Sequence, residues 1–295
     1  MAGISSRAAG SLENKKKYNG YEYNSDFDLN IGEAFFRTHD PQIGRWWQID
    51  PKPTQSESGY VAMGNNPILN YDLLGDILEG TNETSTAREK EIIKNSFQGK
   101  EGKSFNKLIK TSGNTFKKIG EKSFNRAVKN FTPEQKALAK GYKDVINSKT
   151  TFKVEVVKQN ENLSEASQKS TGLNTGKEVN DVGGGGVTTK TGENFFLSVL
   201  VMDATKKIPY VDRATETSIE QPSSAGELSS HEILGHALGL ATRPNSVNGE
   251  TLYSIQASNL YLRAQGITSY FAKEHGFGHS LYSSKQAEQI PDYLQ

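Results

Sequence analysis

The chain from residue 132 onward alternates between helical and strand-like patterns of apolar and polar positions. Thr132 followed by Pro133 supplies an N-cap and a first-turn proline, and the apolar positions that follow keep helical spacing, which predicts a helix. Thr151–Val157 alternates apolar and polar side chains, as a half-buried strand does. Phe195–Met202 is the most apolar run in the chain and predicts a buried strand.

Two more helices are expected near the C-terminal end. One is expected to start at Ser229-Ser230 and to carry two histidines, and the next to run from about Asn248 to Gly266, its C-cap. Residues 158–190 are polar and end in a glycine run, which predicts a loop or hairpin tip. The order of elements favours an α+β domain over residues 132–295, with a small antiparallel sheet beside the histidine-bearing helix.

The chain before residue 132 divides into two differently patterned segments. Residues 1–78 are rich in Tyr, Trp, Asn, Gly and Pro, with short apolar pieces broken by turn signals, which predicts a small β unit of short strands. Residues 79–131 show a weak, glycine-interrupted amphipathic pattern, which predicts a basic helical linker or subdomain.

Composition changes this picture in three ways. Net charge is +1, yet Arg88–Asp144 holds 15 Lys/Arg against 6 Asp/Glu, so the middle of the chain is basic. The chain has no cysteine, which excludes disulfides, thiolate metal ligands and a cysteine nucleophile. No apolar run approaches the roughly 20 residues of a membrane span, and the N-terminal residues lack the hydrophobic stretch of a signal peptide.

The candidate chemistry lies in the run His231-Glu232-Ile-Leu-Gly235-His236. The familiar zinc motif places two histidines four residues apart with a glutamate beside the first, whereas here they are five apart. An α-helix turns about 100° per residue, so positions five apart point about 140° away from each other and cannot share one ion. A one-residue π-bulge would return both rings to one face, and Gly235 would tolerate the distorted backbone.

A zinc site needs a third protein ligand, and the sequence leaves several open. Glu250, in the first turn of the next helix, is the first candidate, His275 is its rival and His279 comes third. Asn259 and Arg263 are expected near the same side of that helix as Glu250, as supports for the ligands.

These residues predict a zinc-dependent peptidase in which His231 and His236 bind the metal and Glu232 is the general base. A structural role for both histidines in a buried helix is the simplest alternative. Another is a non-enzymatic effector or adaptor that binds an acidic partner through the basic region 88–144. A metal-dependent nuclease is disfavoured, because the sequence lacks the paired carboxylates such sites use, and nucleic acid is therefore not the expected partner.

The motif resembles that of the dipeptidyl peptidase III family of zinc peptidases. The signature of that family is His-Glu-Leu-Leu-Gly-His, which differs from His231–His236 at one conservative position. The resemblance covers six residues and implies that histidines at this spacing hold zinc, with the intervening glutamate as catalytic base.

A second resemblance covers residues 1–78, which look like the end of the core of Rhs/YD-repeat polymorphic toxins. In those proteins a β-cage of repeats encloses a variable C-terminal toxin, and this segment marks the junction. The motifs that carry the resemblance occur in order: Glu13-Asn14-Lys-Lys-Lys-Tyr18-Asn19-Gly20, Arg37-Thr-His-Asp40-Pro41-Gln-Ile-Gly44-Arg45-Trp46, Asp50-Pro51 and Asn65-Asn66-Pro67-Ile68.

This chain departs from the Rhs pattern in two places. Glu33–Asp40 stands where a Tyr-Gly-Ala-Arg-Tyr-Tyr-Asp run is usual. Asp72-Leu-Leu-Gly75 replaces the closing Asp-Pro-x-Gly. In some relatives this closing region supports self-cleavage that frees the toxin, and the loss of its proline puts such cleavage in doubt here. Asn259-Leu-Tyr-Leu-Arg263 and His275-Gly276 resemble a pattern in the zincin-like toxins that follow such junctions.

The Rhs resemblance implies a delivered effector, made in the bacterial cytoplasm and exported by a dedicated secretion system. The expected partners are a peptide or protein substrate, a cognate immunity protein and an Rhs-repeat cage if the chain is part of a longer protein.

Overall fold

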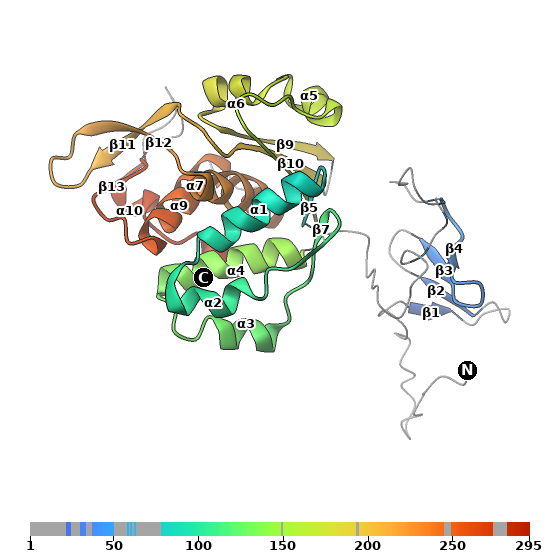
Figure 1. Ribbon diagram of the computed structural model, residues 1–295. Coiled ribbons are helices and arrows are strands. Elements are labelled where there is room, and N and C mark those ends of the chain that lie inside the picture. The colour runs from blue at the N-terminus through green and yellow to red at the C-terminus, as the bar shows by residue number, and fades with distance from the viewer. Residues whose placement is uncertain are drawn as a thin grey trace. The chain divides into compact units, whose positions relative to one another are not determined.

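The computed structural model describes residues 22–24, 30–33, 37–49, 58, 60, 62, 78–148, 150–192, 195–244, 249–273 and 282–295 (Figure 1). The chain forms two compact units, Met1–Asp76 and Ile77–Gln295, which are described separately.

The described part of the first unit is a four-stranded antiparallel meander in the order β1-β2-β3-β4. The strands are short: β1 is Glu22–Asn24, β2 Ile31–Glu33, β3 Thr38–Asp40 and β4 Arg45–Trp46. The Asp40 carboxylate organises the β3–β4 turn, because it accepts hydrogen bonds from the Gln42 backbone (2.9 Å) and the Trp47 indole (3.2 Å). Short strands with tight turns were expected here. The closing segment Asp72–Gly75 lies outside the described residues.

The second unit begins with strand β5 and helices α1 to α4, and the first and fourth of these helices start at clear capping signals. Asn82 caps the first helix by accepting from the Ser85 amide, and Thr132 forms a capping box with Gln135 at the start of the fourth, where the sequence predicts a helix. The helices are α1 (Glu83–Asn95), α2 (Gly99–Asn106), α3 (Glu121–Ala127) and α4 (Pro133–Asn147).

The larger sheet is mixed rather than antiparallel. Its described strands run in the order β6-β7-β5-β8-β10-β9, and β8 pairs in parallel with both β5 and β10. The strands are β5 (Leu78–Gly80), β6 (Thr111–Ser112), β7 (Thr115–Phe116), β8 (Thr151–Val157), β9 (Gly186–Gly192) and β10 (Phe195–Val201). The predictions of strands at 151–157 and 195–202 are confirmed. The expectation that these two strands belong to a small antiparallel sheet is wrong, because β8 and β10 are parallel neighbours joined by a crossover that the pattern did not reveal.

Part of one crossover lies in the polar stretch that the sequence predicts as a loop. Residues 158–190 contain α5 (Glu165–Thr171), α6 (Gly176–Gly183) and most of β9. Gly172 and Gly184 end these helices in the left-handed conformation, at φ 73° and 67°. The glycine run therefore closes a helix and leads into an edge strand.

The remaining strands form a three-stranded antiparallel sheet in the order β12-β11-β13. The expected histidine-bearing helix starts earlier than Ser229, since Ser224 is the N-cap and accepts from the Glu227 amide. The bounds are β11 (Lys207–Asp212), β12 (Ser218–Pro222), α7 (Ala225–Ser229), the π-helix η4 (Ser230–Leu238), α8 (Gly239–Thr242), α9 (Gly249–Ala264), β13 (Tyr270–Phe271), α10 (Ser284–Ala287) and the 3-10 turn η5 (Asp292–Leu294).

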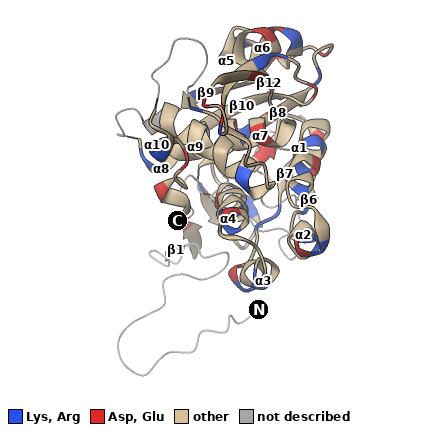
Figure 2. Cartoon of the chain, turned by 90° about the vertical axis from the view of Figure 1, so that its left-hand side faces the viewer, with Lys and Arg blue, Asp and Glu red and all other residues tan. Residues whose placement is uncertain are grey.

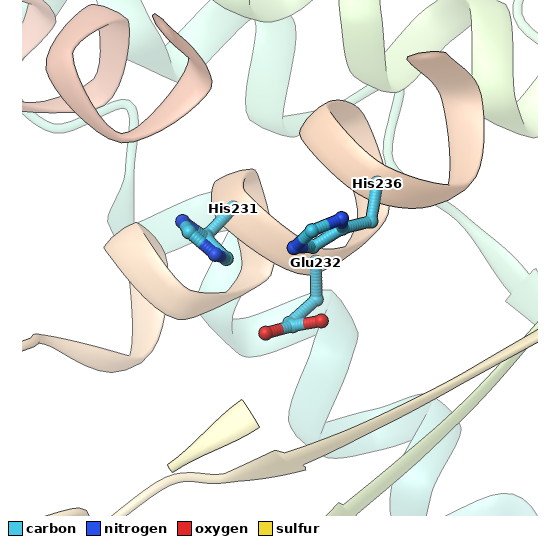
Figure 3. Close-up of side chains that lie close together, drawn as sticks. All are labelled: His231, Glu232 and His236. Atoms are coloured by element: carbon cyan, nitrogen blue, oxygen red, sulfur yellow. The ribbon is translucent and has the colours of Figure 1, made fainter. Parts of the chain in front are cut away.

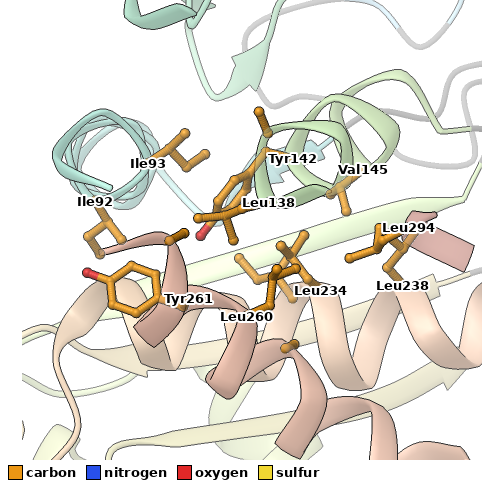
Figure 4. Packing of buried hydrophobic residues seen from close by; sticks show 14 of the residues in the cluster. Ile92, Ile93, Leu138, Tyr142, Val145, Leu234, Leu238, Leu260, Tyr261 and Leu294 are labelled. Carbon is orange, nitrogen blue, oxygen red and sulfur yellow. The ribbon is translucent and has the colours of Figure 1, made fainter. Parts of the chain in front are cut away.

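One hydrophobic core joins the segments on both sides of residue 132 (Figure 4). It brings Ile93 of α1, Tyr142 of α4, Leu234 of the π-helix and Leu260 of α9 together, each no more than 1% exposed. The π-helix is thus surrounded by helices from most of the second unit. The fold class is α+β, as expected, and among the described residues no helix has the length and apolar character needed to cross a bilayer.

Candidate metal centre

A π-helix places the two motif histidines on one face. Ser230–Leu238 is wound as a π-helix, in which hydrogen bonds run between residues five apart, so His231 and His236 are one turn from each other. Their ring centroids lie 5.0 Å apart with the planes at 72° (Figure 3). The predicted π-bulge is confirmed, and it extends over nine residues rather than a single insertion.

Gly235 is needed for space rather than for backbone torsion. A Cβ atom at Gly235 would lie 2.3 Å from the Cα of Ser254 on α9, and Gly235 is not among the described residues with positive φ. Contact at this distance involves backbone, which cannot move aside as a flexible side chain can. The glycine therefore lets α9 cross the π-helix closely, next to the histidines.

Ser258 of α9 orients the first histidine. Its Oγ lies 2.9 Å from His231 Nδ1, and the serine is 4% exposed. A hydrogen bond at Nδ1 fixes the ring orientation and leaves Nε2 for a metal ion.

Strand β9 holds the motif glutamate. Thr188 Oγ1 donates to Glu232 Oε2 at 2.7 Å and lies 2.8 Å from Ser198 Oγ on β10. A Cβ atom at Gly186 would lie 2.6 Å from Glu232 Oε1, so this glycine leaves room for the carboxylate against the strand. Glu232 is 4% exposed, and its carboxylate is fixed between the π-helix and β9.

His231, Glu232 and His236 could together hold a metal ion. One nitrogen of each histidine and one Glu232 oxygen lie within 4.8 Å of one another. Two imidazoles and a carboxylate form a donor set that suits zinc and other first-row divalent ions. The same geometry allows Glu232 to remain outside the ligand set and to act on a molecule beside the ion.

The candidates for the third ligand stay predictions. Glu250 lies in the first turn of α9, one turn before Ser254, but its side chain is outside the described part of the chain. His275 and His279 fall within residues 274–281, which are also outside it. The predicted span of this helix, from about Asn248 to Gly266, agrees with α9.

Asn259 and Arg263 face other parts of the C-terminal segment. The Asn259 side chain donates to the Ala272 and Ala287 carbonyls at 2.7 and 2.8 Å and accepts from the Ala272 amide at 2.7 Å. Burial lowers the pKa of Arg263, and nearby Glu288 opposes that shift. Among the described side chains of α9, Ser258 contacts a motif histidine, with its Oγ at 2.9 Å from His231 Nδ1.

A buried polar network lies behind the histidine-bearing helix, and sequence reasoning missed it. Ser229, at the end of α7, donates to Glu89 Oε1 of α1 at 2.7 Å and lies 3.0 Å from the Tyr142 hydroxyl of α4. Glu89 is fully buried, and desolvation raises its pKa to about 8. No local pattern signals this network, because Glu89 and Ser229 are 140 residues apart in sequence.

A second buried carboxyl group precedes the motif by one turn. Glu227 of α7 accepts a hydrogen bond from the Tyr210 hydroxyl of β11 at 2.8 Å, and the same hydroxyl lies 2.8 Å from Ser223 Oγ. Desolvation raises the pKa of Glu227 to about 7. The helix is therefore held by buried polar groups on two sides just before the motif.

Comparison with known proteins gives no family for the chain. No protein-family model, curated protein or solved structure matches it. The interpretation of the site therefore rests on its residues and their geometry.

Proposed function

We propose that the second unit is a zinc-dependent peptidase. The observation that carries this proposal is the π-helix, which places His231 and His236 one turn apart with Glu232 beside them. A π-helix is rare, and short π segments are frequent at functional sites. Two histidines with an adjacent glutamate on one helix are the donor pattern of zinc peptidases.

The mechanism assigns a role to each side chain around the site. His231 and His236 would hold the ion, and Ser258 would keep the His231 ring turned toward it. A bound zinc ion would supply Lewis acidity, polarising the scissile carbonyl and acidifying water. Glu232 would accept the proton of the attacking water and deliver it to the leaving amine, while Thr188 holds one carboxylate oxygen in place.

Strand β9 offers a place for an extended peptide. It is the last strand in the described order of the larger sheet, and it passes directly beside Glu232. A peptide that adds to a sheet edge gains main-chain hydrogen bonds whatever its sequence. We infer that the substrate lies along β9 with its scissile bond next to Glu232.

The first test is the metal content of the purified chain, measured by mass spectrometry beside the double variant His231→Ala/His236→Ala. About one zinc ion per chain, lost in the double variant, is expected from a site with two imidazole ligands. Absence of bound zinc in the wild type after reconstitution would refute the proposal. Glu232→Gln is the matched control for activity, because it should retain the ion and lose peptide hydrolysis.

The setting that we propose for this peptidase is a delivered bacterial toxin. Its support is the resemblance of residues 1–78 to the junction of Rhs/YD-repeat toxins, together with the metal-site geometry of the unit that follows. A zincin-like domain released from an Rhs cage would need an export system and an immunity protein. Expression of residues 77–295 in bacteria should inhibit growth, and Glu232→Gln should abolish the inhibition.

A second candidate function is binding of an acidic protein through α2, α3 and the segment between them. This stretch, residues 99–129, holds nine basic residues against two acidic ones, all exposed, and blue positions recur along it in Figure 2. We call the nine the lysine-rich surface: Lys100, Lys103, Lys107, Lys110, Lys117, Lys118, Lys122, Arg126 and Lys129.

The lysine-rich surface favours an electrostatic partner. Glu121, one of the two acidic residues, is paired with Lys143 of α4 at 2.9 Å, so it does not neutralise the surface. Among the described residues, no large hydrophobic side chain of this stretch is exposed. Base stacking and membrane insertion both use exposed aromatic or apolar side chains, so neither is favoured here. Binding to an acidic protein that weakens steeply with salt, and persists in the His231→Ala/His236→Ala variant, would support this function.

A further inference from the structure

The π-helix receives a hydrogen bond from the last turn of the described chain. Tyr293, in η5, donates from its hydroxyl to the Leu234 carbonyl at 2.6 Å. Leu234 lies between His231 and His236 in the motif. The bond therefore reaches the backbone of the one turn that sets the spacing of the two rings.

The Leu234 carbonyl belongs to the π-helix Ser230–Leu238 itself, so its bond to Tyr293 joins η5 directly to the backbone of the motif. The carbonyl lies inside the protein, and Leu234 itself is fully buried. A carbonyl oxygen has two lone pairs, so a donor from outside the helix adds a hydrogen bond to this buried group and stabilises the backbone around it.

The Tyr293 hydroxyl is suited to be that donor. Desolvation raises the pKa of Tyr293 well above its ordinary value, so the hydroxyl keeps its proton at any physiological pH. The turn that carries it is fixed at two points. Lys140 Nζ of α4 donates to the Tyr293 carbonyl at 2.9 Å, and the neighbouring Leu294 is 2% exposed within the core.

We propose that Tyr293 is a positioning residue that fixes the π-helix and, through it, the spacing of His231 and His236. Its consequence for metal binding rests on the proposed peptidase function. Phenylalanine fills nearly the same space as tyrosine but has no hydroxyl. Tyr293→Phe therefore removes the hydrogen bond to Leu234 and keeps the packing of the ring.

Tyr253 supplies a matched control. Its ring packs edge-on against the Tyr293 ring at 5.0 Å and contacts Gly239 at the end of the π-helix. Within the part of the chain that the structure describes, no hydrogen bond from its hydroxyl is found. Tyr253→Phe therefore removes a hydroxyl from the same aromatic pair without removing a donor from the π-helix.

The experiment compares Tyr293→Phe and Tyr253→Phe in the chain as a whole. Zinc affinity is measured by competition with a chromophoric chelator, and denaturant unfolding of the metal-free proteins checks that both variants fold. We expect Tyr293→Phe to weaken zinc binding about tenfold or more, and Tyr253→Phe to stay within about twofold of the wild type. Equal zinc affinities in the two variants would overturn the proposal.

Amide hydrogen exchange of the metal-free proteins provides a readout that does not need the ion. Amides of residues 234–239 should exchange at least about tenfold faster in Tyr293→Phe than in Tyr253→Phe, because the local opening becomes easier. Equal exchange in this segment would also overturn the proposal. A wild type that binds no zinc would refute the peptidase function, and the exchange comparison would still decide whether Tyr293 fixes the helix.

Discussion

Replacement of Glu89 by glutamine should change how the free energy of unfolding depends on pH. Burial raises the pKa of this carboxyl to about 8, against an ordinary value of 4.5, so the folded protein holds a proton that the unfolded chain releases. Stability from this group is complete below about pH 4.5 and is lost as the pH rises through 8. Glu89→Gln keeps the acceptor for Ser229 and has no titratable proton.

The size of the effect follows from the two pKa values. Between pH 5 and pH 8 the wild type should lose about 1.4 kcal/mol per pH unit from Glu89, about 4 kcal/mol in all, as an upper limit. Glu227 titrates in the same direction in both proteins, so its contribution cancels in the difference. Glu89→Gln should therefore be close to the wild type in stability near pH 5 and clearly more stable near pH 8.

The assay is urea unfolding of both proteins at half-unit steps from pH 5 to pH 8.5, followed by circular dichroism. Glu91→Gln, at an exposed position of the same helix, should keep the pH dependence of the wild type. A difference between Glu89→Gln and the wild type that stays constant over this range would refute the reasoning, because it would show that Glu89 does not hold its proton in the folded state.

Three more predictions concern the site. Gly235→Ala should lower the free energy of unfolding by about 1–3 kcal/mol or more, because its Cβ would lie 2.3 Å from a backbone atom. Gly183→Ala, whose Cβ would meet its nearest neighbour at 4.0 Å, should have little effect in the same urea titration. Ser258→Ala should weaken zinc binding by about 10–100-fold in chelator competition, and an unchanged affinity would contradict its role in orienting the histidine ring. Thr188→Val should lower kcat for peptide hydrolysis by about tenfold, because Glu232 loses a hydrogen-bond donor. Thr188→Ser keeps the hydroxyl and should retain most of the wild-type kcat. A serine variant as slow as the valine variant would count against a role for this hydrogen bond.

The sequence predicted elements where one local pattern decides the outcome. Thr132 and Pro133 mark a helix start by capping and by fixed φ, and α4 begins there. The spacing of His231 and His236 demanded a π turn if both rings were to share a face, and the structure has one. Ser224 with Glu227 carries an equally local N-cap signal for the start of α7, upstream of the start predicted at Ser229.

The elements that the sequence did not predict depend on contacts between distant residues. Strand β9 is polar along most of its length because it is an edge strand, so it shows no apolar alternation. In the sequence Glu89 looks like an ordinary polar residue on the surface of a helix. Its burial beside Ser229 and Tyr142 becomes apparent only in the structure. The role of Gly235 was misassigned for the same reason, since the backbone of Ser254 that requires it belongs to another helix.

Strand β5 and helix α1 determine where the chain can be divided. β5 lies inside the larger sheet between β7 and β8, and α1 supplies the carboxyl group behind the motif helix. Separation of the chain at residue 131 would remove β5 from its place beside β8, and it would remove Glu89, the hydrogen-bond acceptor of Ser229. Exchange of the C-terminal segment between related chains would therefore preserve the candidate metal site only when the join lies before residue 77. The basic helical segment has to be exchanged together with the two histidines.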